Sequence, residues 1–205
     1  MLFWFPAKHL NQYQYAGPEL SIAGDFFKNF NFRELNEEDF YKNIVFEEKD
    51  RKNRYLNHIK KGHRCFAFVD SKGMTAAYFW LTIGRENQYH PVPIFKQSGW
   101  LLSPDEAYLW DCRTLANYRR QGLYKAGLQR LVALCQQQHI KKIMMSCDIS
   151  NAISNAGIIS AGFKFCGTVH FRAIGKLKTI RCYKRRFKIM PMTSPVITID
   201  VFPTV

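Results

Sequence analysis

A short basic turn that contains a glycine, Arg119-Arg120-Gln121-Gly122, stands between two segments of different character. Residues 107–114 are rich in bulky side chains that favour a strand. Apolar residues after Gly122 recur at the spacing of a helix that buries one face. A glycine turn before a helix presents backbone N–H groups to a phosphate, and two guanidinium groups add positive charge. The pattern predicts a phosphate-binding loop, and its alternative is an ordinary solvated turn.

The turn matches neither of two better-known phosphate loops, because no Gly-Lys-Ser or Gly-Lys-Thr follows it and no Gly-x-Gly-x-x-Gly motif is present. Residues 118–124 instead resemble the acyl-CoA pyrophosphate loop of the GNAT N-acetyltransferase superfamily. Arg119 and Gly122 match that pattern, and Tyr124 stands where the family has a small residue. A second block resembles the family in the expected order, with Asn151-Ala-Ile-Ser154 followed by Gly162-Phe163.

This resemblance covers roughly residues 33–186 and implies a fold. It implies an α/β protein with the GNAT fold, a mixed central sheet of six to seven strands flanked by helices on both faces. The segments at 107–114 and 141–147 are then expected to be parallel neighbours, joined by a crossover helix at 122–139.

The resemblance also implies an activity, N-acetyltransferase. The donor would be an acyl-CoA, acetyl-CoA first, and the acceptor a primary amine of a small molecule such as an amino sugar or amino acid. In the family, the edge of the fourth strand binds the thioester arm, which places Arg113, Thr114 and Leu115 there. The other cofactor-binding positions that the resemblance implies are Arg119, Arg120, Gln121, Gly122, Leu123, Tyr124, Asn151 and Ser154.

Acyl transfer to an amine requires a base for the amine proton. Asp111 is the first candidate, because an acidic residue in an apolar strand needs a partner and partial burial would raise its pKa toward the useful range. Its alternative is a structural salt bridge, for example to Arg113. Glu106, at the start of the same strand, is the second candidate and would act through water.

The family often uses a tyrosine as general acid for the leaving thiolate, four residues before the closing Gly-Phe. Ile158 occupies that position here, so this acid is excluded. Tyr124 is the candidate substitute, and its alternative is simple packing on the helix. Ser154 could also donate, unless it only caps a helix, or the thiolate could leave without full protonation.

The composition allows a sizeable core in 205 residues, with 47% hydrophobic and 15% aromatic side chains. A net charge of +14 favours an anionic partner, although it could also serve solubility. Two alternatives to an acyl-CoA-dependent N-acetyltransferase therefore stay open. One is a GNAT-like enzyme that takes a long acyl chain from an acyl carrier protein, and the other is a non-catalytic nucleic-acid-binding module. No nucleic-acid motif is recognised, so no nucleic-acid partner is expected.

Six cysteines show neither Cys-x-x-Cys spacing nor a pairing with histidine at ligand spacing. They are typical of small buried side chains in a reducing compartment, so no metal site is expected and the location is predicted to be cytoplasmic. The apolar start of the chain is too short for a signal peptide, and no run reaches the length of a membrane span.

The chain is predicted to divide into an N-terminal extension at 1–25, an acyltransferase domain at 26–189 and a tail at 190–205 that adds an edge strand or stays mobile. The long connection at 84–105 is a candidate border of a substrate cleft, with Tyr89, His90, Phe95 and Trp100 as lining residues, or else a self-packed lid. The expected elements are strands at 26–35, 65–69, 74–83, 107–114, 141–147, 163–174 and 176–184, and helices at 36–47, 50–61, 122–139 and 155–161.

Overall fold

The structure is a computed structural model that describes residues 4–20, 29–42, 49–97, 99–174, 177–183 and 197–198. The strands are β1 Trp4–Tyr15, β2 Phe30–Leu35, β3 Arg64–Asp70, β4 Thr75–Ile83, β5 Glu106–Thr114, β6 Lys142–Asp148, β7 Phe163–Ile174, β8 Leu177–Tyr183 and β9 Ile197–Thr198. The helices are α1 Glu37–Lys42, α2 Lys49–Lys60, α3 Pro93–Gln97, α4 Leu123–Gln137 and α5 Ala152–Ser160, with a 3-10 turn at Ala116–Tyr118.

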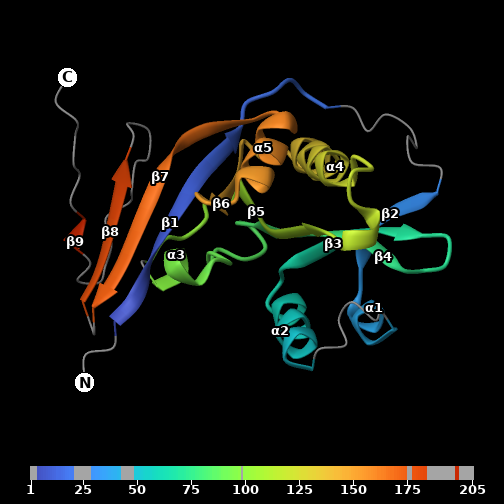
Figure 1. Ribbon diagram of the computed structural model, residues 1–205, viewed down its shortest axis with the longest axis horizontal. Coiled ribbons are helices and arrows are strands. Elements are labelled where there is room, and N and C mark those ends of the chain that lie inside the picture. The colour runs from blue at the N-terminus through green and yellow to red at the C-terminus, as the bar shows by residue number, and fades with distance from the viewer. Residues whose placement is uncertain are drawn as a thin grey trace.

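These strands form one mixed sheet in the order β2-β3-β4-β5-β6-β1-β7-β8-β9, which counts nine strands in the described chain. Helices lie on both faces, with α4 and α5 on one side and α1, α2 and α3 on the other (Figure 1). The expected α/β GNAT fold is therefore confirmed. The seven strands expected from the sequence are β2 to β8 in chain order, while β1 is an additional strand inside the sheet and β9 lies at one edge.

The centre of the sheet contains the expected parallel pair. β5 and β6 pair from Glu106 with Lys142 to Leu109 with Met145, and α4 is the crossover between them. Pairing ends there, although β5 continues to Thr114 and β6 to Asp148, and all of these residues are described. The two strands therefore separate at their carboxyl ends.

Two cores hold the helices to the sheet. On one face, side chains of α4 such as Leu128 and Leu131 pack on Phe79 and Leu109. Gly127 lets α4 approach closely, because a Cβ there would lie 2.1 Å from the Phe79 ring. On the other face, α1 and α2 bury Phe40 and Tyr55 against Trp80, and α3 covers a third cluster with Phe95 on Tyr108.

The N-terminal segment differs from the expected extension. β1 lies inside the sheet, antiparallel to both β6 and β7, with Leu10 opposite Asp148 and Val169. Polar residues such as Asn11, Gln12 and Gln14 interrupt the apolar residues of β1, whereas the strands in the interior of a sheet usually consist of apolar runs. Gln12 is 1% exposed and accepts a hydrogen bond from the Tyr108 hydroxyl at 3.4 Å. The folded domain thus includes residues 4–15.

The remaining elements follow the sequence patterns closely. Asn36 caps α1, because its side chain accepts from the Asp39 N–H at 3.1 Å while the Asp39 carboxylate accepts from the Asn36 N–H.

In the tail, β9 pairs with β8 and supplies the edge strand that was one of two expectations. None of the helices in the described part of the chain has the length and apolar character that a membrane crossing requires.

Candidate active site

A β-bulge in β5 marks the point where the central strands separate. Trp110 pairs with Trp80 and Arg113 pairs with Tyr78, so Asp111 and Cys112 together face only Phe79 on β4. Asp111 has a φ of 40°, a strained value for a residue other than glycine. Such bulges bend a strand and redirect a side chain. Here the bulge begins two residues after Leu109, the last residue of β5 that pairs with β6.

The Asp111 carboxylate is exposed and accepts a hydrogen bond from the Tyr55 hydroxyl of α2, with an oxygen–oxygen distance of 2.6 Å. Because that bond uses the only hydroxyl proton of Tyr55, the Tyr78 hydroxyl at 3.2 Å donates to Tyr55. Burial, followed by the negative charge of Asp111, raises the pKa of Tyr55 far above its usual value. Tyr55 therefore stays a hydrogen-bond donor to Asp111.

Glu106, the second base candidate, lies at the opposite end of β5 from the bulge. Its carboxylate forms an ion pair with Lys142 at 2.7 Å and accepts from the Ser103 N–H at 3.1 Å. These contacts join the starts of β5 and β6. In this position the ion pair of Glu106 with Lys142 stabilises the parallel pairing of β5 with β6.

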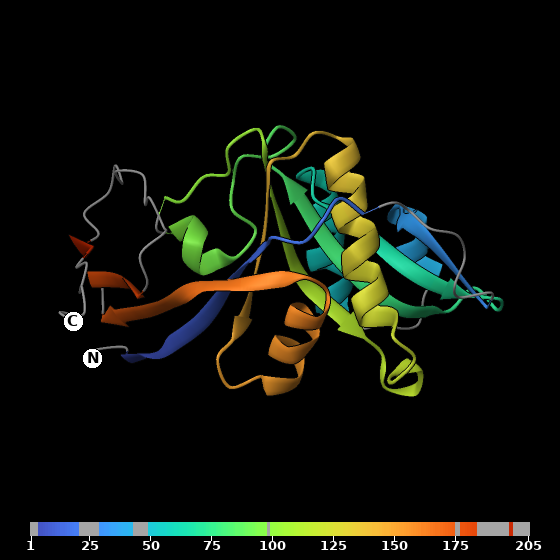
Figure 2. The ribbon, with the colours of Figure 1, turned by 90° about the horizontal axis from the view of Figure 1, so that it is seen from above.

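The basic glycine turn lies between β5 and α4, as the sequence predicts, and follows the 3-10 turn at Ala116–Tyr118 (Figure 2). Gly122 is the N-cap with a φ of 78°, and Arg120 before it has a φ of 65°. A glycine has no side chain to cap the helix, so the first N–H groups of α4 remain available. Arg119, Arg120 and Gln121 are exposed around them, and the buried Leu123 fixes the start of the helix.

Arg113 and Thr114, for which a thioester-binding role is expected, end β5, and Leu115 follows them. Leu115 is held by its N–H, which donates to the Ala76 carbonyl at 2.9 Å. Arg113 is exposed, and Thr114 is half-buried. Within the described residues, the buried Thr114 Oγ1 has no hydrogen-bond partner, which is consistent with a polar group that a ligand would satisfy.

The Tyr124 ring crosses from α4 to α5, where a Cβ on Gly157 would lie 3.0 Å from it. Its hydroxyl lies 3.2 Å from the Ser154 Oγ, and burial raises the pKa of Tyr124 well above its usual value. Asn151 caps α5 by accepting from the Ser154 N–H at 3.1 Å, so the cap is Asn151 and not Ser154. Ile158 is fully buried in the core beneath α5.

Five cysteines have free thiols: Cys65, Cys112, Cys135, Cys147 and Cys166. Burial raises the pKa of the Cys112 thiol, which donates to the Trp110 carbonyl at 3.4 Å. A protonated thiol is a poor nucleophile, so Cys112 does not serve as one. Among the described residues, no group of three histidine, cysteine or acidic side chains is arranged to hold a metal ion.

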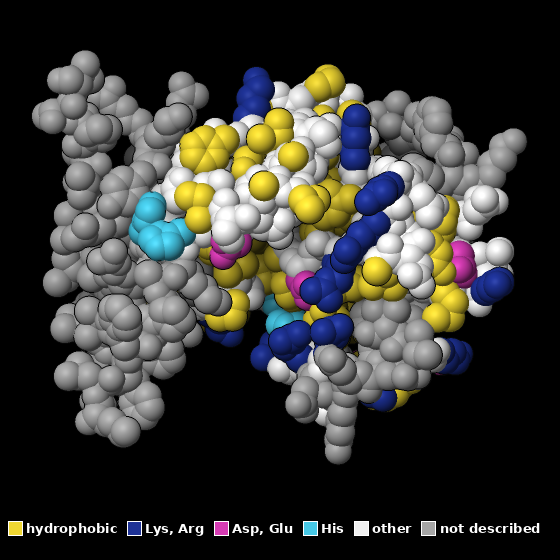
Figure 3. Space-filling model, in the orientation of Figure 1, with side chains coloured by type: hydrophobic (Ala, Val, Ile, Leu, Met, Phe, Trp, Pro, Cys, Tyr) yellow, Lys and Arg dark blue, Asp and Glu magenta, His cyan; other side chains and the backbone are white. Residues whose placement is uncertain are grey.

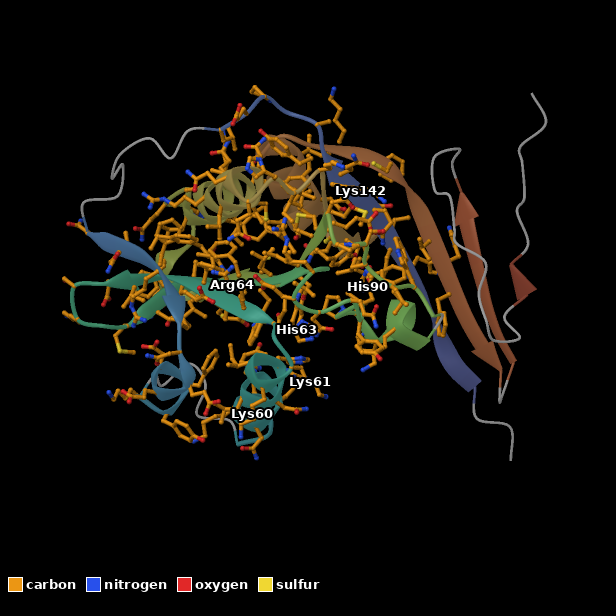
Figure 4. All side chains as sticks on the ribbon, turned by 180° about the vertical axis from the view of Figure 1, so that it is seen from behind. Lys60, Lys61, His63, Arg64, His90 and Lys142 are labelled. Atoms are coloured by element: carbon orange, nitrogen blue, oxygen red, sulfur yellow. The ribbon has the colours of Figure 1, made fainter. Side chains whose placement is uncertain are left out.

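The 84–105 connection contains α3 and forms one wall of a cavity of about 510 Å³ on the α2 side of the sheet. Tyr89 and His90, two of the four residues proposed to line a substrate cleft, line this cavity, whereas Phe95 and Trp100 pack on the His90 ring. Figure 4 shows His63 at the start of β3 facing the loop that carries His90, with Lys61 at the end of α2. His58 and His63, which no motif marked, complete the opposite wall.

On the face shown in Figure 3, Lys and Arg side chains gather in a row between the start of α4 and α2. Because α4 and α2 cover opposite faces of the sheet, this row crosses from one face to the other (Figure 1). A positive surface of this kind attracts an anionic ligand.

This fold and site define a class, that of α/β proteins of the N-acetyltransferase type. The model of the acetyltransferase (GNAT) family matches residues 29–157, and the chain belongs to that family. No match was found among curated proteins.

Solved structures share the fold at low sequence identity. A GNAT-family protein from Novosphingobium aromaticivorans is 16% identical with a TM-score of 0.57, covering 85% of this chain and 67% of its own. A GNAT-family acetyltransferase from Colwellia psychrerythraea is 17% identical with a TM-score of 0.54, covering 83% and 56%. One from Sphaerobacter thermophilus is 13% identical with a TM-score of 0.58, covering 83% and 53%. The chain thus spans between about half and two thirds of the length of these relatives.

Proposed function

We propose that the protein is an acyl-CoA-dependent N-acyltransferase that uses acetyl-CoA and a primary amine of a small molecule such as an amino sugar or amino acid. The observation that carries the proposal is the separation of β5 from β6 at the Asp111 bulge, beside the uncapped start of α4. Membership of the acetyltransferase (GNAT) family supports acyl transfer from coenzyme A.

In this proposal the donor lies along the end of β5. The backbone of Arg113, Thr114 and Leu115 binds the arm, and the N–H groups of Gln121 to Tyr124 bind the phosphates, with Arg119 and Arg120 alongside. When bound, coenzyme A supplies an acyl group activated as a thioester. The residues of the chain hold it in place and move protons, which suits a reaction that depends mainly on positioning.

Asp111 is the base of the proposed reaction. Its carboxylate takes the proton that the acceptor nitrogen loses, and the Tyr55 hydroxyl keeps the carboxylate oriented. Tyr124 holds a proton on the other side of the site, because burial favours its neutral form. Its hydroxyl donates that proton to the leaving sulfur, and Ser154 fixes its position.

Steady-state turnover tests the proposal. The purified protein is incubated with acetyl-CoA and a panel of small primary amines, and free thiol and acetylated amine are both measured. The expected result is thiol release that depends on the amine, with acetylated amine formed in equal amount. Absence of product with every amine and with longer acyl-CoA donors would contradict the function.

A further inference from the structure

The cavity on the α2 side of the sheet adjoins the candidate active site. Trp110 packs against two of the histidines that line the cavity. The centroid of its ring lies 4.8 Å from that of His58 and 5.4 Å from that of His63. Trp110 is the residue before Asp111 in β5. On α2, His58 follows one turn after Tyr55, which binds Asp111. A molecule in the cavity would therefore reach toward the base.

The charged side chains that line the cavity are mainly cationic. Lys61 and Lys96 are exposed at its border, and neither has an ion-pair partner in the described part of the chain. Glu86 is the one acidic lining residue, and its carboxylate lies 3.7 Å from Arg64, which also pairs with Glu34 at 2.6 Å. The cavity thus has an excess of positive charge.

A buried donor without an acceptor lies in the wall of the cavity. His90 is 1% exposed, and its Nδ1 accepts from the Val92 N–H at 3.2 Å. The Nε2 atom must then carry the proton of the neutral ring. That Nε2, like the Nδ1 of His58, has no hydrogen-bond partner among the described residues. Unsatisfied buried polar atoms are rare in native proteins and indicate a missing ligand or water.

The histidines themselves are uncharged at neutral pH. Burial, followed by the charges of neighbouring cationic groups, lowers the pKa of His58 and of His63 to about 4. Lys61 and Lys96 are among those cations for both histidines. A bound anion would oppose this positive potential and accept hydrogen bonds from the imidazole N–H groups.

We infer that this cavity receives the part of the amine acceptor that carries a carboxylate or a phosphate, and that Lys61 and Lys96 bind that anionic group. The inference rests on the proposed function, because the amine must reach Asp111. The same lysines repel polycationic amines such as aminoglycosides, so these are poor acceptors.

Matched pairs of acceptors test this preference. An amino sugar phosphate is compared with the free amino sugar, and an amino acid with its amide, in wild type, Lys61→Gln and Lys96→Gln. Each variant should lower kcat/KM for the anionic member about ten- to a hundredfold through KM, since charge-assisted hydrogen bonds are lost. The uncharged member should be unaffected. Lys60→Gln is the control, because Lys60 is the exposed neighbour of Lys61 on α2 and does not line the cavity (Figure 4).

A titration with inorganic phosphate gives a result that does not depend on turnover. Imidazole NMR signals of His63 and His90 should shift with phosphate in wild type and in Lys60→Gln, but require higher phosphate in Lys61→Gln. Equal loss for both members of each acceptor pair, or no response of these signals to phosphate, overturns the inference. If no amine is acetylated at all, the proposed function fails by itself, and the phosphate titration alone decides whether the cavity binds anions.

Discussion

Asp111 combines three features that seldom coincide: a bulge position, a positive φ of 40° and a hydrogen bond from a buried tyrosine. Backbone strain costs free energy, on the order of 1–3 kcal/mol, and persists where the surrounding structure imposes it. The strained backbone places an exposed carboxylate beside the point where the central strands separate. We therefore assign the proton transfer to Asp111 and a structural role to Glu106.

The Asp111→Asn variant should lose most activity and keep its fold. An amide oxygen still accepts from Tyr55, but it cannot take a proton, so kcat should fall by about 10²- to 10⁴-fold. Steady-state kinetics and acetyl-CoA calorimetry check both parts. Asp105→Asn, which removes an exposed carboxylate just before β5, should keep full activity. A kcat equal to that of wild type in Asp111→Asn would exclude Asp111 as the base.

The Tyr124→Phe variant tests the proton donor. If the Tyr124 hydroxyl protonates the leaving sulfur, kcat should fall by about 10²- to 10⁴-fold while acetyl-CoA affinity is retained. Tyr118→Phe is a matched control, because its hydroxyl near the same turn donates to Asp70 instead. Unchanged kcat in Tyr124→Phe would mean that the thiolate leaves without this acid.

At the scale of elements, the β5–α4–β6 unit follows from local sequence patterns. The strand, the glycine turn and the helix are contiguous in the chain, so their short-range signals predicted the parallel pair. Local patterns could not predict the bulge, because a bulge is defined by the pairing of two strands, here β5 with β4. The hydrogen bond from Tyr55 to Asp111 could not be predicted for a related reason. Tyr55 lies 56 residues before Asp111, and its position in α2 is typical of an ordinary apolar side chain.

The start of α4 should contribute directly to coenzyme A affinity. Arg119→Ala removes one charge beside the free N–H groups and should weaken acetyl-CoA binding by about one to two decades, as measured by calorimetry. Arg85→Ala is the control, because Arg85 donates to the Gln138 carbonyl at the other end of the same helix. Unchanged affinity in Arg119→Ala would place the phosphates elsewhere.

At the scale of the whole molecule, β1 is the main departure from prediction. An interior strand needs partners on both edges, and β6 and β7 supply them from residues at least 130 positions away in the chain. Some polar side chains of β1 also find distant partners, as when Tyr13 donates to the Asn155 side chain at 2.6 Å, whereas the buried Gln12 Nε2 has no partner among the described residues. Partners so distant in the chain leave no local pattern in the sequence of β1. The sequence therefore predicts only an N-terminal extension at 1–25.

The buried histidines should make the stability of the whole protein depend on pH. Burial lowers the pKa of His63 to about 4 and that of His90 to about 3, below the usual 6.5 of an unfolded chain. Between these values the unfolded chain binds more protons, so the free energy of unfolding falls as pH falls below about 7. Each such histidine adds at most about 1.4 kcal/mol per pH unit to that slope.

Urea unfolding at pH 7 and pH 5 measures this dependence. His90→Phe keeps a ring against Tyr108 and Phe95 but binds no proton, so its loss of stability between the two pH values should be smaller than that of wild type. The same loss in both proteins would mean that the His90 pKa is not lowered in the fold.

We propose that acyl-CoA binds where β5 leaves β6, with its phosphates at the start of α4. Amide hydrogen exchange with and without acetyl-CoA tests that placement directly, because bound ligand slows the exchange of the N–H groups it contacts. We expect slower exchange at 113–115 and 121–124, and unchanged exchange in β2. Unchanged exchange at both of those segments in the presence of saturating acetyl-CoA would contradict it.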